Sequence, residues 1–536
     1  METAPPDQIT PSLPRAGVLM TAGTIISRIT GVIRLAVLAA TLGVVETRFT
    51  DTYNLANTAP NILYELVLGG VIASVFVPVF VELLENNDRD EAWRSISAIF
   101  NISLLVLAAL AIIGVIAAPL LANFYASRLA GEELARQHDV LVFLMRLFIP
   151  QVVLYGIYFM GSGVLNAHRK FVLPMFTPIL NNLVLIVVLI LFSKWHDLVT
   201  LDSVTTSQLL LLGLGTTASV APMGLLLLPA FLRLGRYTFT IRIEPELRRR
   251  IFQLSVFVFG FVASNQVAYL VMQWLANEQQ GGYTAFLMAN AFFLLPIGLF
   301  VWTITTAVLP RLTREALAES WASFAKTLSS TSNAVNFLMI PSAVVLFVLA
   351  EPLVNVLLRH GVVTGRSTDL IADVLRFLVL GLVQFSLFQI YIRAFYALQD
   401  AKTPFLVNAV VVVLNMGVNL PMFAWLGVEG LAAGQGLAYS AGLIIQFRLL
   451  RRRVGHLAVR PMLISGLRLG VAAAAMAATL YVSLQIARDL TSSGALGDLV
   501  QVVIPLTLGA ATYLGAAVLL RVEEIDYLKR AVLRPR

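Results

Sequence analysis

Two arginines stand inside the first apolar stretch of the chain. Residues 16–42 are long enough to cross a bilayer as a helix, and they contain Arg28 and Arg34. A charged side chain at mid-membrane costs at least ~2.5–3.5 kcal/mol, so it normally faces a bundle interior or a water-filled cavity. Arginine forks also match phosphate oxygens in bidentate fashion. The two residues therefore predict a polar path through the membrane that accepts an anionic group such as a diphosphate.

The spacing of Arg28 and Arg34 limits how they can share one site. Six residues of α-helix correspond to ~600° of rotation and ~9 Å of rise, so the two side chains of a straight helix diverge by ~120°. Both serve one site only if the helix bends at Gly31 or the path wraps around it. The alternative is that one arginine binds substrate while the other pairs with a neighbouring helix.

Glu65 is the other costly charge, deep in the second apolar stretch. It could pair with Arg28 or Arg34 while the path is empty, exchange protons, or form a static salt bridge. Uncharged polar residues in membrane helices usually hydrogen-bond between helices. We nevertheless assign three of them to the lining of the path: Asn265, Gln266 and Asn290.

A second group of residues has expected roles in gating or bending. Asp51 stands at the outer mouth of the second stretch, where a gate contact and a helix N-cap are equally consistent with its position. Arg393 belongs toward the cytoplasmic end of a later stretch and could steer an incoming headgroup. Glycine and proline interrupt helices, and we expect hinges at Gly31, Pro60 and Pro296.

The rest of the chain supplies the helices that such a path needs. Of 536 residues, 58% are hydrophobic and 13% are charged, and the mean hydropathy is +0.84. Soluble domains carry roughly 25% charged residues. We predict an all-α polytopic membrane protein with about fourteen spans, at 16–42, 53–82, 95–123, 138–166, 171–193, 207–233, 251–276, 283–309, 329–350, 370–398, 404–426, 429–448, 464–487 and 498–520.

The net charge of +8 reflects topology rather than nucleic-acid binding. Fourteen spans put both termini on one side, and the loops of that side hold most of the Lys and Arg. The positive-inside rule then places both termini in the cytoplasm. The loops of the opposite side carry only Arg48, Arg128, Arg136, Lys194, Arg359, Arg366 and Arg488.

Two pairs of similar segments indicate an internal duplication. SVFVPVFVELLE contains Pro78 and its counterpart TAVLPRLTREAL contains Pro310, whereas GVLNAHRKFVLP ends at Pro174 and its counterpart AFYALQDAKTP ends at Pro404. The separation between the prolines is nearly the same in both pairs. Each repeat holds six spans, so two parallel lobes and alternating access are expected. The predicted divisions are a cytoplasmic tail 1–15, an N-lobe 16–234, a C-lobe 235–453, two further helices in 454–522, and a cytoplasmic tail 523–536.

These segments together resemble one family, the peptidoglycan lipid II flippases (MurJ or MviN). The similar stretches are 27–43 (SRITGVIRLAVLAATLG), 50–80, 351–364 (EPLVNVLLRHGVVT) and 393–404 (RAFYALQDAKTP). The resemblance implies a member of the MOP superfamily, which exports multidrug compounds, oligosaccharide-lipids and polysaccharides. It further implies a flippase that moves a polyprenyl-diphosphate-linked cell-wall precursor outward across the bacterial inner membrane, beside membrane lipids and the cell-wall synthesis machinery.

The chain departs from the family pattern at several positions. Family members often have arginines at the positions of Tyr64, Glu65 and Ala291. Leu35 replaces an acid that often follows the second arginine of the first helix. The expected path is less cationic than in much of the family, which bears on the exact substrate more than on transport itself.

The sequence contains no GxxxxGK[ST] and no HExxH motif, its five histidines are scattered, and it has no cysteine. We therefore expect a transporter rather than an enzyme, without metal or other cofactor, coupled to the membrane potential or to an ion or substrate gradient. One alternative is an exporter of another lipid-linked oligosaccharide or of a drug-like solute. A cation exporter would need membrane acids, and the spans offer little beyond Glu65 and Asp373. Another alternative is a non-transporting scaffold for cell-wall assembly, which has no need for charge inside 16–42.

Overall fold

The structure is a computed structural model that describes residues 13–69, 76–86, 88–194, 198–455, 459–491 and 494–525. Every regular element within these ranges is a helix. The chain forms two compact units. Unit 1 comprises Met1–Leu42 and Thr52–Gln266, and unit 2 comprises Gly43–Asp51 and Val267–Arg536. Residues 1–12 and 526–536 of the two predicted tails lie outside the described residues.

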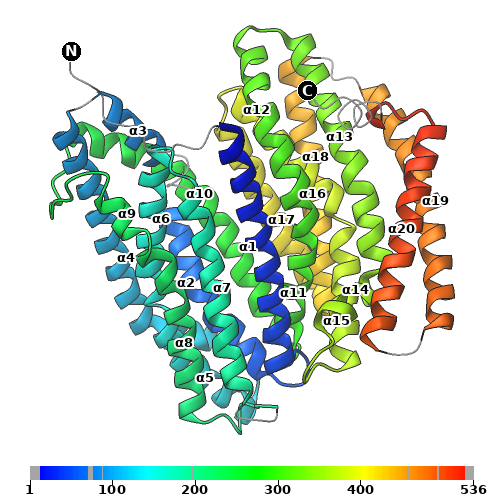
Figure 1. Ribbon diagram of the computed structural model, residues 1–536, viewed down its shortest axis with the longest axis horizontal. Coiled ribbons are helices and arrows are strands. Elements are labelled where there is room, and N and C mark those ends of the chain that lie inside the picture. The colour runs from blue at the N-terminus through cyan, green and yellow to red at the C-terminus, as the bar shows by residue number, and fades with distance from the viewer. Residues whose placement is uncertain are drawn as a thin grey trace. The chain divides into compact units, whose positions relative to one another are not determined.

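Unit 1 is a bundle in which α7 packs against α1 and α8, while α6 packs against α4 and α8 (Figure 1). α10 begins in this unit and leaves it after Gln266. The elements are α1 (Leu13–Leu42), α2 (Phe49–Tyr64), the π-helix η1 (Glu65–Gly69), α3 (Val77–Asn86), α4 (Arg89–Ala126), α5 (Gly131–Phe148), α6 (Gln151–Ala167), α7 (Val172–Ser193), α8 (Thr206–Leu225), α9 (Leu228–Leu232) and α10 (Pro245–Ala276).

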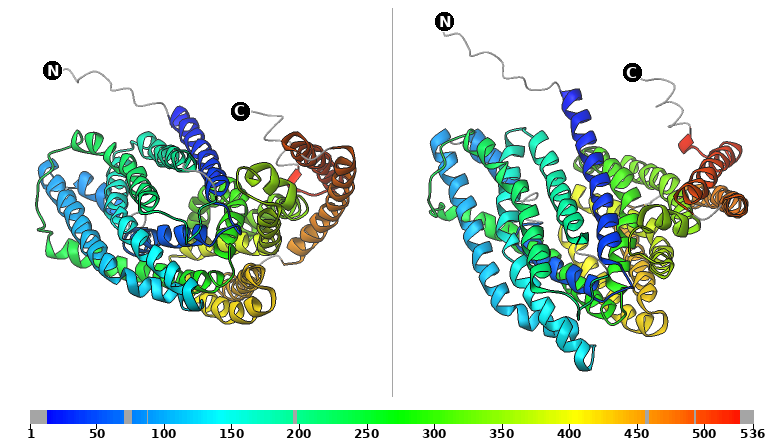
Figure 2. Two further views of the ribbon diagram at one scale, coloured as in Figure 1. Left: turned by 90° about the horizontal axis from the view of Figure 1, so that it is seen from below. Right: turned by 60° about the horizontal axis from the view of Figure 1, so that its bottom comes forward.

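Unit 2 is a second bundle, in which α18 packs against α15, α16 and α17. The last two helices, α19 and α20, lie together along one side of this unit, where α19 contacts α13 (Figure 2). The remaining elements are α11 (Gly282–Pro296), the π-helix η3 (Ile297–Val301), α12 (Trp302–Leu317), α13 (Trp321–Val348), α14 (Ala350–Leu358), α15 (Gly365–Val379), α16 (Leu382–Ala397), α17 (Lys402–Leu426), α18 (Val428–Val454), α19 (Val459–Leu490) and α20 (Ala495–Leu519).

The helices confirm a polytopic membrane fold. Among the described residues, nine helices are long and apolar enough to cross a membrane, or ten if α15 and α16, bent by 48°, form one span. The other predicted spans also fall on helices: 16–42 on α1, the described parts of 53–82 on α2, η1 and α3, 251–276 on α10, and 429–448 on α18. The exact count of fourteen stays a prediction.

Two backbone features recur with the separations found in the sequence. The π-helices begin at Glu65 and Ile297, which are as far apart as Pro78 and Pro310. Two non-glycine residues in left-handed conformation, Arg169 (φ 59°) and Gln399 (φ 57°), lie in the α6–α7 and α16–α17 turns, where Pro174 and Pro404 follow them at the same distance. Both pairs support the duplication.

The boundary between the predicted lobes differs from the boundary between the compact units. The predicted lobes meet between residues 234 and 235, in the connection that leads from α9 to α10. The compact units instead divide the chain after Gln266, inside α10, because the first part of this helix packs in unit 1. The lobe boundaries therefore stay a prediction.

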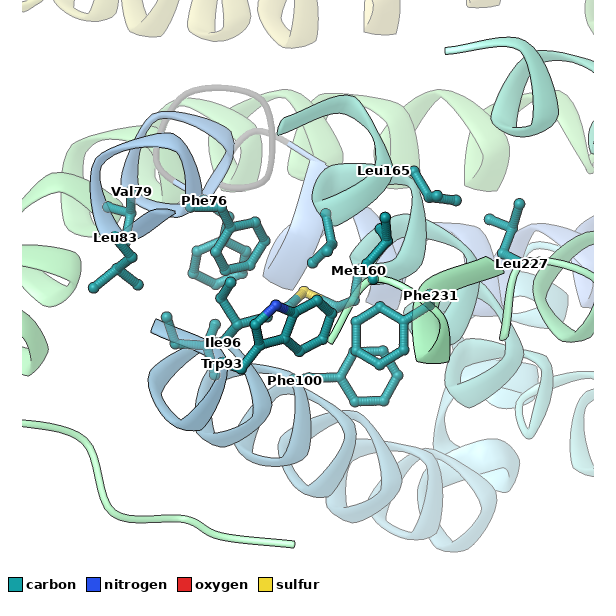
Figure 3. Packing of buried hydrophobic residues seen from close by; sticks show 14 of the residues in the cluster. Phe76, Val79, Leu83, Trp93, Ile96, Phe100, Met160, Leu165, Leu227 and Phe231 are labelled. Carbon is teal, nitrogen blue, oxygen red and sulfur yellow. The ribbon is translucent and has the colours of Figure 1, made fainter. Parts of the chain in front are cut away.

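A large apolar cluster holds one end of unit 1 together. Trp93 on α4 is 1% exposed and lies edge-on to Phe231 of α9, and Phe100 stacks on the same ring (Figure 3). Phe76 and Met160 belong to the same cluster. Aromatic pairs of this kind add ~0.5–1.5 kcal/mol to the free energy from burial alone. The cluster therefore fixes α4, α6 and α9 against one another.

Close packing of α17 and α18 depends on Gly430. A Cβ atom at this position would overlap the carbonyl oxygen of Met422, which is backbone and cannot move aside. Gly430→Ala should lower stability by about 1–3 kcal/mol, the usual cost of overpacking, measured as a lower melting temperature. Gly417→Ala is the matched control, because a Cβ there meets no atom within 4 Å. An equal melting temperature for the two variants would contradict this packing.

Candidate functional site: charged residues in α1, the π-helices and the 43–51 loop

The two arginines of α1 lie in different surroundings. Arg34 is partly buried in unit 1, within electrostatic range of Tyr53 on α2 and Tyr155 on α6. Arg28 is exposed. Within the described part of unit 1 neither guanidinium pairs with a carboxylate. The guanidinium of Arg34 therefore lies near aromatic residues inside the unit, whereas Arg28 lies at an exposed position.

α1 packs closely on α7. Asn182 of α7 donates to the Thr30 hydroxyl (3.0 Å) and reaches the Ser27 carbonyl (3.4 Å). A Cβ at Gly23 would lie 3.0 Å from the Phe176 ring, so α1 approaches α7 closely there. α1 runs through Gly31 as one helix, which agrees with the divergence expected from the spacing of the arginines. The hinge at Gly31 stays a prediction.

Glu65 has an amide partner in this structure. It is the first residue of η1, shortly after Pro60, and its carboxylate accepts a hydrogen bond from Gln266 of α10. Gln266 is 7% exposed, so the pair joins α10 to η1 within unit 1. The neighbouring Asn265 bonds back to the Phe261 carbonyl of its own helix at 3.0 Å. Of the predicted path residues, the structure thus brings Glu65 and Gln266 together.

Asp51 is fully buried in unit 2 and binds the start of α11. Its carboxylate accepts from the Gly281 N–H (2.6 Å), the Thr284 N–H (2.8 Å) and the Thr284 hydroxyl (2.6 Å). The first N–H groups of a helix have no intrahelical acceptor, and an anion there is stabilised by the helix dipole. Asp51 therefore caps α11 rather than its own helix. Its role as a gate stays a prediction.

The whole 43–51 loop is tied to unit 2 by side chains of both charges. Arg48 is 8% exposed and donates to the carbonyls of Asn277 (2.6 Å) and Glu278 (3.4 Å), just after α10 ends. Gln280 donates to the Val45 carbonyl at 2.8 Å. The positive charge of Arg48 lies at the C-terminal end of α10, and the negative charge of Asp51 lies at the N-terminal end of α11. Each charge is opposite in sign to the helix dipole at its end, so both are stabilising.

Glu46 anchors the same loop to the start of α15. It accepts from the Thr364 N–H (2.7 Å), the Thr364 hydroxyl (2.6 Å), the Ser367 hydroxyl (2.7 Å) and the Val44 N–H (2.6 Å). Partial burial alone would raise the pKa of Glu46, but the hydrogen bonds from Thr364, Val44 and Ser367 outweigh it and hold the pKa below its ordinary value. The carboxylate form is therefore the one that fastens the loop.

Glu46→Gln should destabilise the protein by about 1–2 kcal/mol, because an amide accepts fewer of these bonds. A carboxylate with a lowered folded-state pKa stabilises at pH above its unfolded value and loses that contribution as pH falls through the folded value. The difference in melting temperature between wild type and Glu46→Gln should therefore shrink below about pH 4.5. The exposed Glu244→Gln is the control. A constant difference across this pH range would refute the anchor.

Unit 2 also contains Arg393, Asn290 and Pro296. The Arg393 guanidinium lies 5.8 Å from the ring centroids of both Trp302 and Tyr396, within cation–π range. Pro296 is the last residue of α11 and directly precedes η3, which Trp302 follows. Asn290 lies mid-way along α11 and is half-buried. The roles of these residues in binding and bending stay predictions.

Several residues at these sites were missed by sequence reasoning. Tyr53, Tyr155 and Trp302 stand in apolar helices, where an aromatic side chain is ordinary core. Glu46 was missed as well, because apart from Val44 its partners lie 318 to 321 residues away. Among the described residues, no group of His, Cys, Asp or Glu could hold a metal ion.

Comparison with known proteins decides the family. A family model described as lipid II flippase MurJ matches residues 38–501. The chain belongs to the MurJ family. A relative from Rhizobium meliloti (strain 1021), named probable lipid II flippase MurJ, is 27% identical over 465 residues, covering 86% of this chain and 84% of the relative. Another of the same name from Vibrio cholerae serotype O1 is 26% identical over 528 residues, covering 96% and 97%.

Solved structures show the same fold. One described as lipid II flippase MurJ in an inward closed conformation has a TM-score of 0.76 at 21% identity, covering 96% of this chain and all of that one. An inward-facing MATE-family multidrug transporter of the MOP superfamily has a TM-score of 0.64 at 14% identity, covering 82% and 98%. The chain therefore shares its fold with a transporter of the MOP superfamily.

Proposed function

We propose that this multi-pass membrane protein moves lipid II, a lipid-linked cell-wall precursor, from the cytoplasmic to the outer leaflet. Family membership over residues 38–501 is the observation that carries the proposal. The partly buried Arg34 supports it chemically, because a diphosphate is a bidentate acceptor for guanidinium groups. Membrane lipids surround the protein, and the cell-wall synthesis machinery is its proposed functional partner.

Alternating access is the proposed mechanism. Each unit contains a π-helix at an equivalent repeat position, and such wide turns often mark functional sites and bend points in helices. Arg34 holds the diphosphate when the path is loaded, and Glu65 remains bonded to Gln266 when it is empty.

The energy source is the membrane potential or an ion gradient, without a resident cofactor. Flipping in proteoliposomes with an imposed potassium diffusion potential, compared with collapsed gradients, tests this coupling.

The protein lies in the bacterial inner membrane with both termini in the cytoplasm, following the distribution of basic residues. Reporter fusions after Arg15 and after Arg536 are expected to report the cytoplasm for both. Signals from opposite sides would show an odd number of spans and overturn this topology.

The decisive experiment is depletion of the protein in its own host, followed by measurement of lipid II in each leaflet. Outer-leaflet lipid II should fall while the cytoplasmic pool rises, before growth stops. Unchanged leaflet distribution combined with defective wall synthesis would favour a scaffold instead. A normal wall with altered export of another lipid-linked oligosaccharide or of a drug-like solute would favour a different substrate.

A further inference from the structure

The connection between α9 and α10 lies fixed along α4. Asn101 of α4 donates to the carbonyls of Thr238 (3.3 Å) and Thr240 (2.9 Å), and it accepts from the Tyr237 hydroxyl. The Thr238 N–H donates to Ser97 at 3.2 Å. Tyr237 also contacts the rings of the cluster in Figure 3. The segment is therefore held in place from one side, and its other side chains turn outward.

These outward side chains border an open groove against α4. The groove has a volume of about 350 Å³ and is lined by Leu105, Phe239, Thr240, Ile241 and Arg242. Phe239 is 83% exposed and Ile241 57% exposed, although both are large and apolar. An arginine beside exposed apolar side chains is the combination found where protein meets lipid headgroups. We call this feature the α4 groove.

The exposure pattern of α4 fixes the depth of the α4 groove. The large apolar side chains that α4 exposes run from Leu105 to Phe124, a separation of ~28 Å along a helix. This length matches the ~30 Å thickness of the hydrocarbon core of a bilayer. Trp93 and Asn101, which precede Leu105, are buried against unit 1 instead. Leu105 therefore marks one edge of the hydrocarbon core, and Arg242 beside it stands at headgroup level.

Charge identifies the kind of headgroup. The exposed charged side chains between residues 233 and 249 are mostly cationic, with Glu244 and Glu246 as the acidic exceptions. A guanidinium group binds phosphate oxygens in bidentate fashion, and clustered arginines attract anionic lipids. The apolar lining gains nothing from contact with a soluble phosphate ion, whereas it can pack against an acyl chain. The arginines of this segment are Arg233, Arg236, Arg242, Arg248 and Arg249, of which Arg242 lines the groove.

We propose that the α4 groove binds an anionic phospholipid, with its phosphate on Arg242 and an acyl chain against Leu105, Phe239 and Ile241. The proposal does not depend on the transported substrate. It concerns a lipid that stays in one leaflet, on a face of unit 1 outside the predicted path. The bound lipid would cover exposed apolar surface and hold the α9–α10 connection at the membrane boundary.

Photo-crosslinking tests the proposal on the full-length protein. The protein is placed in phosphatidylcholine nanodiscs with a trace of phosphatidylglycerol or phosphatidylcholine that carries a diazirine in its acyl chain. Mass spectrometry then locates the label. The phosphatidylglycerol probe should label residues 236–250 and the Leu105 region more strongly than the phosphatidylcholine probe. Arg242→Gln should reduce this labelling about fivefold, the factor expected for one arginine near a membrane surface.

Arg236→Gln is the matched control, because it removes the same charge from an exposed position that does not line the groove. It should reduce the labelling clearly less than Arg242→Gln does, because only Arg242 lines the groove, and the melting temperatures of both variants should equal that of wild type. Equal labelling by both probes, or equal loss in both variants, would overturn the proposal in favour of non-specific attraction. Displacement of the phosphatidylglycerol probe by millimolar glycerol phosphate would overturn it in favour of a soluble phosphate ligand.

Discussion

Arg34→Ala is expected to abolish flipping while the protein remains inserted at its normal level. Arg34 is the partly buried cation of α1 and lies within electrostatic range of Tyr53 and Tyr155. Two charge-assisted hydrogen bonds to a diphosphate contribute about 1.5–3 kcal/mol each, so their loss predicts at least a hundredfold fall in transport. Complementation of a depleted strain and lipid II flipping in proteoliposomes are the two measurements.

Arg34→Lys separates charge from geometry. Lysine keeps the charge but loses the planar fork, so activity should be intermediate. The exposed Arg146→Ala in α5 is the matched control, because it removes an arginine from another membrane helix and should leave flipping intact. Full complementation by Arg34→Ala would remove this residue from the site. Wild-type activity of the lysine variant would show that the charge suffices and the fork is not needed.

Asp51→Ala is expected to cause the second large effect, on stability and activity together. It leaves the Gly281 and Thr284 N–H groups at the start of α11 without their acceptor, inside a buried site. Leaving buried donors unsatisfied costs about 3 kcal/mol, which corresponds to a fall in melting temperature on the order of 5 °C. Transport should fall with it, because α11 leads directly into η3.

Asp51→Asn refines the test, since it keeps one acceptor oxygen but removes the charge that favours a helix start. Its melting temperature should lie between those of wild type and the alanine variant. Asp139→Ala, at an exposed position on α5, is the control and should change neither property. A stable Asp51→Ala variant without transport would show a direct role in gating instead of capping.

Hydropathy and repeat spacing predicted the helical membrane fold because a span is a long local signal. Residues 370–398 fall on the bent α15–α16 pair, whose 48° break does not interrupt the apolar pattern. The π-helices were not predicted, because one wider turn leaves composition unchanged. Pro60 and Pro296 lie shortly before the two π-helices, but a proline does not determine whether the following residues form α- or π-type hydrogen bonds.

Site residues could be predicted where the free-energy cost of burying a charge in the membrane singles them out. Arg34 and Glu65 stood out because charge in a membrane helix is expensive. Their partners were not predictable, since Gln266 lies 201 residues after Glu65 and only the folded chain brings them together. The sequence left open whether Glu65 pairs with an arginine, exchanges protons or forms a static salt bridge, and in this structure its carboxylate accepts from the Gln266 amide. The function of Asp51 as a cap likewise depended on a helix that starts far along the chain.

The paired wide turns at Glu65 and Ile297 also bear on the history of the chain. A π-turn holds one residue more than an α-turn, so the insertion of a single residue into a helix is one route to such a turn. Two independent insertions at matching positions of the two halves are less economical than one insertion in a common ancestor. The predicted duplication therefore accounts for both turns by one event, in a half-protein that already carried the turn.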